Sequence, residues 1–432
     1  MHYLDSVLIA GLWGRDEAVG FKFDPQYNFL IGQNGTGKTT VVNLIAATLD
    51  GDFEQLDKTQ FERIEIVLKM KGSRRKPSII VIKTPKKDIP YFDISYEIKL
   101  QASSKPITFD LDALAEARAY RGMPQRMLRD RMVRQRFLDI QKELRSLVTS
   151  SWLSVNRHTE EERSPDEKRH LSAVDQKLDS LSNRLVRYFS QLSRKYADNT
   201  LEFQKNSFLS LLTSEKEDQL INFSRKIDLE DERKSLSKVF DLLGLEAKQY
   251  EKKLNVHLDK FNASLTSFNT KKAEGKGLST IEFAAMYNAW KAHALVQHYE
   301  ALQQKKTNIF ELRDKFIQIV NELFGNRKKL SISEGNELIF STKEERKIPI
   351  SDLSSGEKQL LIIVGEALLQ DQSTVVYIAD EPELSLHVSW QEQLTAAITR
   401  LNPNAQIIFA THSPDIVGVH SNKIINMESV LG

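Results

Sequence analysis

The first residues suited to chemistry form a glycine-rich run, which reads Gly32, Gln33, Asn34, Gly35, Thr36, Gly37, Lys38, Thr39 and Thr40. An apolar stretch that should form a strand precedes it, and a helical pattern follows it. Glycines at this spacing let backbone N–H groups turn inward around phosphate oxygens, and a helix N-terminus adds partial positive charge. The run therefore predicts a phosphate-binding loop, in which Lys38 reaches the β- and γ-phosphates and the Thr39 hydroxyl ligates Mg²⁺.

Two adjacent carboxylates, Asp380 and Glu381, end the apolar run from Val375 to Ala379. An acidic strand end on its own is commonplace and is usually a solvated turn. Beside a phosphate loop, Asp380 suits the Mg²⁺ shell, and Glu381 stands where it could orient or deprotonate an attacking water. We therefore expect Asp380 and Thr39 as metal ligands and Glu381 as a catalytic residue.

Two further motifs flank this acidic pair in the sequence. Leu353, Ser354, Ser355, Gly356 and Glu357 stand directly before an apolar helical stretch, whose N-terminus the serines could simply cap. The same N-terminus could instead bind an anion such as a γ-phosphate. His412 follows the strand pattern from Ala405 to Ala410, and a single histidine there is usually structural.

Taken in order, these four motifs resemble those of ABC-type ATPases. The segment from Leu353 looks like their signature motif, with Ser355 in place of a glycine, and His412 matches their switch histidine. The resemblance implies ATP and Mg²⁺ as cofactors, Glu381 and His412 as catalytic residues, and nucleotide contacts from the phosphate loop and from Ser354 to Glu357. It also implies a homodimer or higher oligomer, because in that superfamily the signature of one subunit contacts ATP held by the other.

The residues around the acidic pair narrow the resemblance. Asp380, Glu381, Pro382 and Glu383, followed by Leu386, His387, Trp390 and Gln391, resemble the pattern of bacterial phage-defence ATPases related to the overcoming-lysogenisation-defect and chromosome-maintenance (SMC-like) families. The AriA ATPases of PARIS systems are the nearest family by this pattern, and the PtuA ATPases of Septu systems are the rival. This resemblance implies a sensor or scaffold that responds to a phage-derived trigger and controls a separately encoded toprim or HNH nuclease. A DNA-binding or repair ATPase of the SMC type is the alternative.

The elements that must position these motifs divide the chain into three parts. We expect an α/β fold, an ABC-type P-loop head with a mixed sheet, in which 1–160 forms the N-terminal half and 328–432 the C-terminal half. Residues 61–100 alternate as strands do, with Ile64, Ile66 and Leu68 on one face. A helix is expected from Leu111 to about Leu147 and a hairpin around Ser333 to Asn336. The ABC glutamine loop has three candidate positions: Gln125, Gln135 and the Asn156–Arg157 turn.

Residues 161–327 are polar and helical in pattern and form the expected insert. Its first apolar seam runs at heptad spacing through Leu171, Val174, Leu178, Leu181, Leu185, Tyr188 and Leu192, and a second runs from Ile309 to Leu323. A short antiparallel coiled coil and an ordinary helical bundle both fit these seams. The acidic run from Asp228 to Glu232 is interpreted as solvated surface.

Composition excludes several classes of protein. The chain has 432 residues, a net charge of +2 and no cysteine, so disulfides and thiolate metal sites are excluded and a reducing cytoplasm is the expected location. No apolar run approaches the roughly 18 residues of a membrane span. Because the net charge is nearly balanced, any binding of nucleic acid must depend on a local patch. Arg126, Arg129 and Arg134 belong to the arginine-rich stretch from Arg118 to Arg136, which fits either a surface for phosphates or a carboxylate-rich partner, or a solvated helix that pairs with acids elsewhere.

Overall fold

The computed structural model describes residues 2–85, 92–101, 104–110, 131–154, 172–212, 227–273, 279–325 and 327–431. The chain forms two compact units: a head unit of Met1–Tyr188 with Leu312–Gly432, and an insert unit of Phe189–Glu311. The head unit contains strands and helices, whereas the described part of the insert unit contains helices only. The expected α/β head, split by an insert that is helical over its described residues, is confirmed.

A five-stranded parallel sheet lies at the centre of the head unit, in the order β14-β3-β13-β12-β8. Its strands are β3 (Tyr27–Ile31), β8 (Ser150–Ser154), β12 (Val375–Asp380), β13 (Ala405–Ala410) and β14 (Ile424–Asn426). The buried strands β12 and β13 are the continuous apolar runs expected of a parallel sheet. Because parallel strands end at the same edge, the residues that follow β3, β12 and β13 are brought together there.

A second sheet in the head unit is antiparallel and has the order β2-β1-β4-β5-β6-β7. Its strands are β1 (Tyr3–Ala10), β2 (Val19–Lys22), β4 (Arg63–Lys69), β5 (Ser78–Pro85), β6 (Phe92–Lys99) and β7 (Ile107–Asp110). Ile64, Ile66 and Leu68 are fully buried, which confirms the predicted alternation. The head unit is thus mixed in its strand pairing: the pairs in the five-stranded sheet are parallel, and those in the six-stranded sheet are antiparallel.

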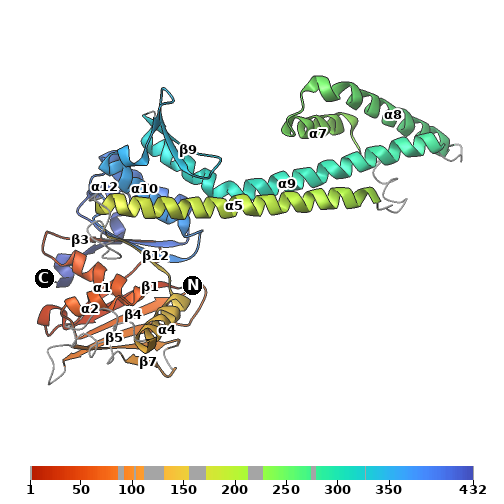
Figure 1. The fold of residues 1–432 in the computed structure, drawn as a ribbon. Coiled ribbons are helices and arrows are strands. Elements are labelled where there is room, and N and C mark those ends of the chain that lie inside the picture. Colours follow the sequence, from red (N-terminus) through yellow and green to blue (C-terminus); the bar gives the residue numbers. More distant parts are fainter. Residues whose placement is uncertain are drawn as a thin grey trace. The chain divides into compact units, whose positions relative to one another are not determined.

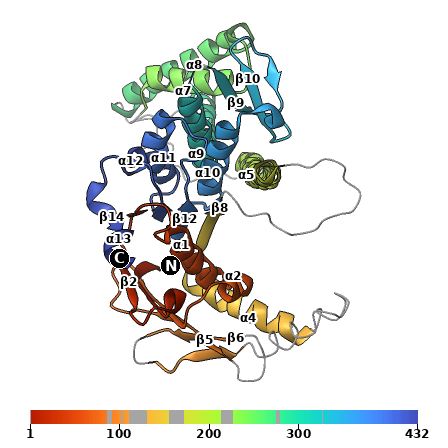
Figure 2. The same cartoon turned by 90° about the vertical axis from the view of Figure 1, so that its left-hand side faces the viewer.

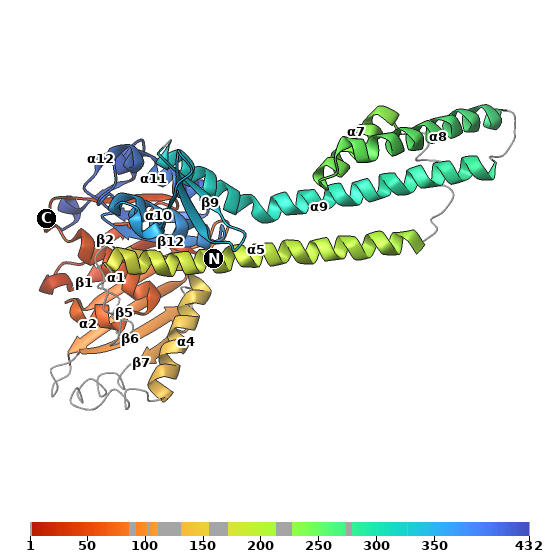
Figure 3. The ribbon, with the colours of Figure 1, turned by 45° about the horizontal axis from the view of Figure 1, so that its top comes forward.

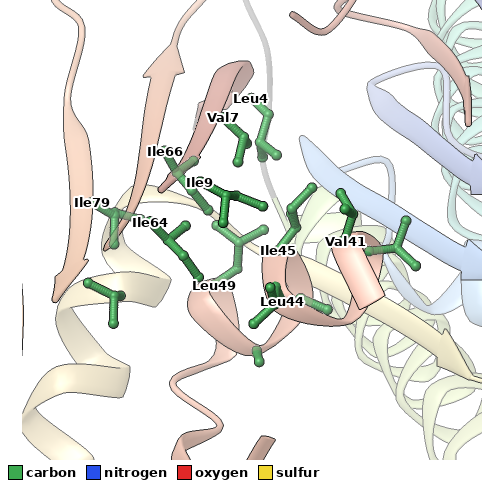
Figure 4. Close-up of a cluster of buried hydrophobic side chains, with 14 of the residues drawn as sticks. Leu4, Val7, Ile9, Val41, Leu44, Ile45, Leu49, Ile64, Ile66 and Ile79 are labelled. Atoms are coloured by element: carbon green, nitrogen blue, oxygen red, sulfur yellow. The ribbon is translucent and has the colours of Figure 1, made fainter. Parts of the chain in front are cut away.

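Helix α1 (Lys38–Asp50) packs between the two sheets. One set of its apolar side chains, including Leu44 and Leu49, joins the cluster formed by β1, β4 and β5 (Figure 4). The same cluster includes Val376 and Ile378 of β12. Helices α2 (Phe53–Lys58) and α4 (Arg131–Leu147) lie beside α1 and complete this layer (Figure 2). Burial on both sides fixes the N-terminus of α1 at the edge of the parallel sheet.

The opposite face of the parallel sheet is covered by helices from the C-terminal part of the chain. Tyr377 of β12 points away from α1, and its buried hydroxyl donates to the Ile363 carbonyl oxygen over 2.6 Å. The covering helices are α10 (Ser355–Leu369) and α11 (Val388–Leu401), which pack on each other. The shorter helices α12 (Pro414–Val417) and α13 (Met427–Leu431) follow β13 and β14, respectively (α12 in Figure 1, both helices in Figure 2).

A small antiparallel sheet of β9 (Lys328–Ile332), β10 (Leu338–Thr342) and β11 (Lys347–Ile348) precedes α10. Strands β9 and β10 form the hairpin that the sequence predicted, with Ser333 and Asn336 joined by a backbone hydrogen bond across its turn. The sheet is followed by a short 3₁₀ turn, Ile350–Asp352, which leads directly into α10.

Helix α5 (Ala173–Leu212) starts in the head unit, where it packs along α10. The predicted seam is correct for Leu178, Leu181 and Leu185, which are all buried. It is wrong at the next position, because Phe189 is fully buried while Tyr188 donates its hydroxyl to Asp371. Ion pairs also join Asp175 to Lys358 and Arg184 to Glu366 of α10. In the head unit, therefore, the start of the seam serves to attach α5 to α10.

The insert unit contains the rest of α5 with α7 (Leu229–Leu242), α8 (Ala247–Ala273) and most of α9 (Thr280–Phe324). Edge-to-face ring pairs join α5 to α9, Tyr196 with Phe310 and Phe203 with Tyr299, so the two helices run antiparallel. Helices α7 and α8 form a second hairpin that packs on α9 (Figure 3). The insert unit is thus an antiparallel helix pair with a helical hairpin against it.

One expectation about the insert is wrong. Glu232 is not solvated surface: it is 5% exposed, and one of its carboxylate oxygens lies 2.6 Å from Nδ1 of His293. Asp228, by contrast, caps α7, because its side chain accepts from the backbone N–H groups of Glu230 and Asp231. A local acidic run could not reveal that α9 places a histidine against one of its members.

Within the described ranges, no helix is long and apolar enough to cross a membrane.

Candidate active site

The phosphate loop lies between β3 and α1, as predicted. Gly35 and Gly37 have φ values of +87° and +85°, which L-residues with side chains rarely adopt. Lys38 is 5% exposed, and its Nζ donates to the carbonyl oxygens of Gly32 at 2.8 Å and Gln33 at 3.1 Å. Gly37 is the N-cap of α1 without a side-chain cap, so backbone N–H groups of the first turn remain available to an anion.

Thr39 and Asp380 meet at this edge of the parallel sheet. The Thr39 hydroxyl donates to a carboxylate oxygen of Asp380 over 3.1 Å, although the two residues are 341 positions apart. Burial raises the pKa of Asp380, and the charges of Glu381 and Glu383 add to that rise, while Thr39 and Lys38 oppose it. Hydroxyl and carboxylate oxygens are ligands that Mg²⁺ prefers, so the pair fits the ion implied by the sequence.

Lys38 is the cation that faces these acidic groups. Burial lowers the pKa of Lys38, whereas the charges of Glu381, Asp380 and Glu383 act to raise it. Burial and the nearby carboxylates thus act in opposite directions on the pKa of this lysine. Among the described residues, the site therefore combines the buried cation of Lys38 with four carboxylates, the fourth being Glu428, which accepts from the Gln33 N–H of the phosphate loop over 3.2 Å.

Glu381 follows β12 in a left-handed conformation, with φ at 48°. Its backbone N–H donates to the Ala410 carbonyl over 2.8 Å, and Asp380 is paired in register with Ala410. The next residues after β13 are Thr411 and His412, so the register places the histidine motif beside the acidic pair. The residues predicted for Mg²⁺ and catalysis thus come together at one sheet edge.

The signature residues begin α10. Ser354 is the N-cap and forms a reciprocal capping box with Glu357, whose carboxylate also pairs with Lys328 at 2.7 Å. Ser354 therefore caps the helix, the simpler of the two roles that the sequence allowed, while Ser355 is exposed at the first helical position. An open hollow of about 800 Å³ lies beside this turn, lined by residues of α10, the 385–389 segment and Arg327. Among the described residues that line the hollow, none belongs to the phosphate loop.

Sequence reasoning missed Trp13, which lies against the phosphate loop. This residue has a left-handed backbone (φ 56°) and is 39% exposed. Its indole touches Gly37 so closely that a β-carbon at Gly37 would overlap it. An exposed aromatic ring against a phosphate loop is suited to stack on a nucleotide base. The sequence itself shows only a tryptophan close to two glycines, a setting that indicates no particular contact.

Several predicted residues fall outside what the structure describes. Arg126 and Arg129 lie outside the described residues, and of Arg134 only the backbone, in α4, is described. Among the glutamine-loop candidates, Gln125 and the Asn156–Arg157 turn lie outside them too, and Gln135 is described only as part of the backbone of α4.

Comparisons with known proteins identify the family. The family model described as AAA ATPase domain matches residues 14–417 of the chain. The chain is similar to the Retron Ec83 probable ATPase of Escherichia coli, with 24% identity over 132 residues, which are 27% of this chain. The match spans only 24% of the length of that relative.

Solved structures provide further similarity. One is the Smc head domain of Pyrococcus furiosus with an extended coiled coil, bound to the C-terminal domain of ScpA. It is 15% identical, with 96% of this chain and 91% of that chain covered, at a TM-score of 0.45. Another is the Smc head domain with a coiled coil and joint from Pyrococcus yayanosii, 13% identical, with 96% and 93% covered, at a TM-score of 0.37. On the match of the family model to nearly the whole chain, the protein belongs to the AAA ATPase domain family.

Proposed function

We propose that the protein binds ATP with Mg²⁺ and hydrolyses it to ADP and phosphate at the edge of the parallel sheet. The observation that carries this proposal is the hydrogen bond between Thr39, the first residue after the phosphate-loop lysine, and Asp380 at the end of β12. It brings together the two oxygen groups that would hold Mg²⁺, beside the buried cation of Lys38.

We assign a proposed role to each residue of the site from its position and from the motif resemblance. The loop from Gly32 to Thr40 holds the phosphates through backbone N–H groups, and Lys38 neutralises their charge. Mg²⁺, when bound to Thr39 and Asp380, offsets charge on the β- and γ-phosphates. Glu381 orients the attacking water and accepts its proton, and His412 contacts the γ-phosphate. Trp13 stacks on the adenine ring from the side of Gly37.

The signature turn completes a second subunit's site in this proposal. Ser354, Ser355, Gly356 and Glu357 belong to the same head as the phosphate loop, yet they line a different hollow. A homodimer with two ATP molecules between its heads would bring each signature turn to the partner's nucleotide. Such a site hydrolyses ATP only when the heads meet, which suits a switch more than a constant turnover.

A role in anti-phage defence is the finer part of the proposal. It rests on the motif resemblance and on the partial similarity to a retron ATPase. We propose a cytoplasmic sensor or scaffold that controls a separately encoded nuclease, as in AriA or PtuA systems. The arginine-rich stretch with Arg126, Arg129 and Arg134 is the proposed surface for that partner, for nucleic acid or for an acidic trigger. We also propose that the chain divides into an N-terminal half of the head (1–160), an insert (161–327) and a C-terminal half of the head (328–432).

The central test is the Mg²⁺ dependence of ATP hydrolysis. The purified protein should release phosphate from ATP with Mg²⁺ and not in excess EDTA. Thr39→Val and Asp380→Asn should each raise the Mg²⁺ concentration needed for half-maximal rate, whereas Thr59→Val, away from the site, should not. Unchanged Mg²⁺ dependence in both site variants would refute the assignment.

The defence role needs a separate experiment. Purified alone, the protein should cleave neither DNA nor RNA, and cleavage should require the product of a neighbouring gene. Nuclease activity of the protein alone that persists in Lys38→Ala would contradict control of a separate effector. Salt-sensitive binding of duplex DNA with no nuclease partner would favour the SMC-like alternative.

A further inference from the structure

Glu383 is a carboxylate at the active-site edge to which the proposed mechanism assigns no role. It stands two residues after Glu381, in the loop between β12 and α11, and its charge acts on both Lys38 and Asp380. The loop itself is fixed by backbone hydrogen bonds from Leu384 to Glu381 and from Leu386 to Glu383. The position of Glu383 next to the reaction centre is therefore well determined by the fold.

One oxygen of Glu383 holds the histidine motif. Its Oε1 accepts from the Thr411 hydroxyl and from the His412 backbone N–H, both at 2.8 Å. The Thr411 hydroxyl in turn accepts from the Ser413 N–H at 2.9 Å, and the Ser413 hydroxyl lies 2.6 Å from the Gln391 side-chain oxygen. Glu383 thus begins a brace that fixes the backbone of His412 relative to β12.

The other oxygen of Glu383 has a different environment. Oε2 is buried and accepts no hydrogen bond from the part of the chain that the structure describes. A buried carboxylate oxygen is costly unless something donates to it, so buried polar atoms without a protein partner commonly serve a water or a ligand. The carboxylate to which Oε2 belongs binds the His412 loop through Oε1, and its charge acts on Lys38 and Asp380, so it belongs to the edge that carries the proposed ATP site.

We propose that Glu383 acts with both oxygens in ATP hydrolysis: Oε1 positions His412, and Oε2 accepts a hydrogen bond from the attacking water. The proposal rests on the proposed function. The oxygen of the water forms the new bond to the γ-phosphorus as the bond to the ADP oxygen breaks. One proton of the water goes to Glu381, and the other is held by Glu383, which gains no proton. Two carboxylates would thus fix both the position and the orientation of the nucleophile.

Glu383→Gln separates the two tasks. The amide oxygen can still accept from Thr411 and His412, while the amide NH₂ replaces Oε2 with a donor, which cannot accept from the water. We expect ATP affinity and the unfolding temperature to stay near wild type, and kcat to fall by about 10- to 100-fold with KM little changed. Glu383→Ala should lose the brace as well and should therefore also raise KM.

A matched pair at Thr411 tests the brace alone. Thr411→Val removes one donor to Oε1 and the acceptor for Ser413, while Thr411→Ser keeps the hydroxyl. We expect Thr411→Ser to resemble wild type and Thr411→Val to lose less kcat than Glu383→Gln, because Oε2 is intact in both.

The outcomes distinguish the inference from the function on which it rests. If wild-type protein hydrolyses ATP and Glu383→Gln keeps kcat within about twofold, the role of Oε2 is refuted. If Glu383→Gln loses stability or ATP affinity as Glu383→Ala does, Glu383 is only a structural brace and the proposal is overturned. If wild-type protein binds no ATP, the proposed function itself fails, and the inference fails with it.

Discussion

The carbonyl oxygen of Ser385 lies so close to Gly356 that a β-carbon at Gly356 would overlap it. Ser385 belongs to the loop that also carries Glu381 and Glu383, and Gly356 belongs to the first turn of α10, the signature turn. The loop that follows β12 therefore carries the residues proposed for hydrolysis, Glu381 and Glu383, at one end and touches the signature turn at the other. In the proposed dimer, this loop connects the ATP site of one head directly to the turn that would contact the partner's ATP.

Gly356→Ala should break this close approach. The overlap is with backbone, which cannot move aside as a flexible side chain can, so either the loop or α10 must shift. We expect the free energy of unfolding to fall by about 1–3 kcal/mol and ATP hydrolysis to fall with little change in ATP affinity. Calorimetry and phosphate release would measure these effects.

Gly335→Ala is the matched control for Gly356→Ala. It lies in the β9–β10 turn, where a β-carbon would meet only the Ser333 hydroxyl at an ordinary 3.6 Å. This variant should resemble wild type in both assays. Equal activity in the two variants would show that the contact with Ser385 does not matter for hydrolysis.

Trp13→Ala should weaken binding of ATP without affecting binding of inorganic triphosphate. The indole lies against Gly37 and is open to solvent, so its loss removes a stacking surface and leaves the phosphate loop in place. Aromatic stacking of this kind corresponds to about 2- to 10-fold in affinity. Trp13→Phe keeps a ring and should retain most of the affinity. A similar loss for ATP and for triphosphate would mean that Trp13 supports the loop instead.

Lys38→Ala should remove measurable ATP binding, because the site loses the buried cation beside the β- and γ-phosphates. Lys58→Ala is a suitable control, since Lys58 is exposed and pairs only with Glu54 on its own helix among the described residues. Titration calorimetry with ATP and Mg²⁺ measures the affinity of both. Unchanged affinity in Lys38→Ala would remove the basis for the phosphate-loop assignment.

Glu381→Gln should bind ATP and hydrolyse it slowly. The substitution removes the carboxylate that would accept the proton and leaves the Thr39–Asp380 pair intact. Because ATP then persists, closed head dimers should accumulate, and light scattering with ATP would show a higher mass than without it. A hydrolysis rate near wild type would show that another group is the base.

The sequence was most informative about the elements of the head. The phosphate loop, strands β12 and β13 and the burial of Ile64, Ile66 and Leu68 each leave a local pattern, either a motif or a periodicity, and all of these elements are present. The seam of α5 was predictable only as far as Leu185. Beyond it, the choice between Tyr188 and Phe189 depends on what α5 packs against, which no local pattern encodes.

Contacts between distant segments could not be predicted in this way. Trp13 reaches Gly37 because a left-handed turn directs its indole there, and turns of that kind have no strong sequence signature. Glu383 was visible only as part of a family-like motif, whereas its bonds to Thr411 and His412 depend on the register of β12 with β13. Glu232 was wrongly predicted to be solvated because its partner, His293, lies on another helix.

The proposed composite site, shared between two heads, leads to the most specific prediction, which concerns two inactive variants. Lys38→Ala lacks a working phosphate loop, and Ser355→Arg places a bulky cation at the exposed first residue of α10, beside the hollow of the signature turn. Neither should hydrolyse ATP alone. In a mixed dimer, the phosphate loop of the Ser355→Arg chain would face the intact signature of the Lys38→Ala chain. One of two symmetry-related sites is then complete, so about half of the wild-type rate per heterodimer is expected if the sites act independently. Differently tagged chains, purified in tandem, would show that heterodimers form.

A mixture of Lys38→Ala with Glu381→Gln is the matched control. Because both substitutions lie on the phosphate-loop side of the proposed site, no complete site can form in this heterodimer, and it should stay inactive. If heterodimers of Lys38→Ala with Ser355→Arg are equally inactive at several mixing ratios, either the signature does not act across the dimer or the two sites must fire together.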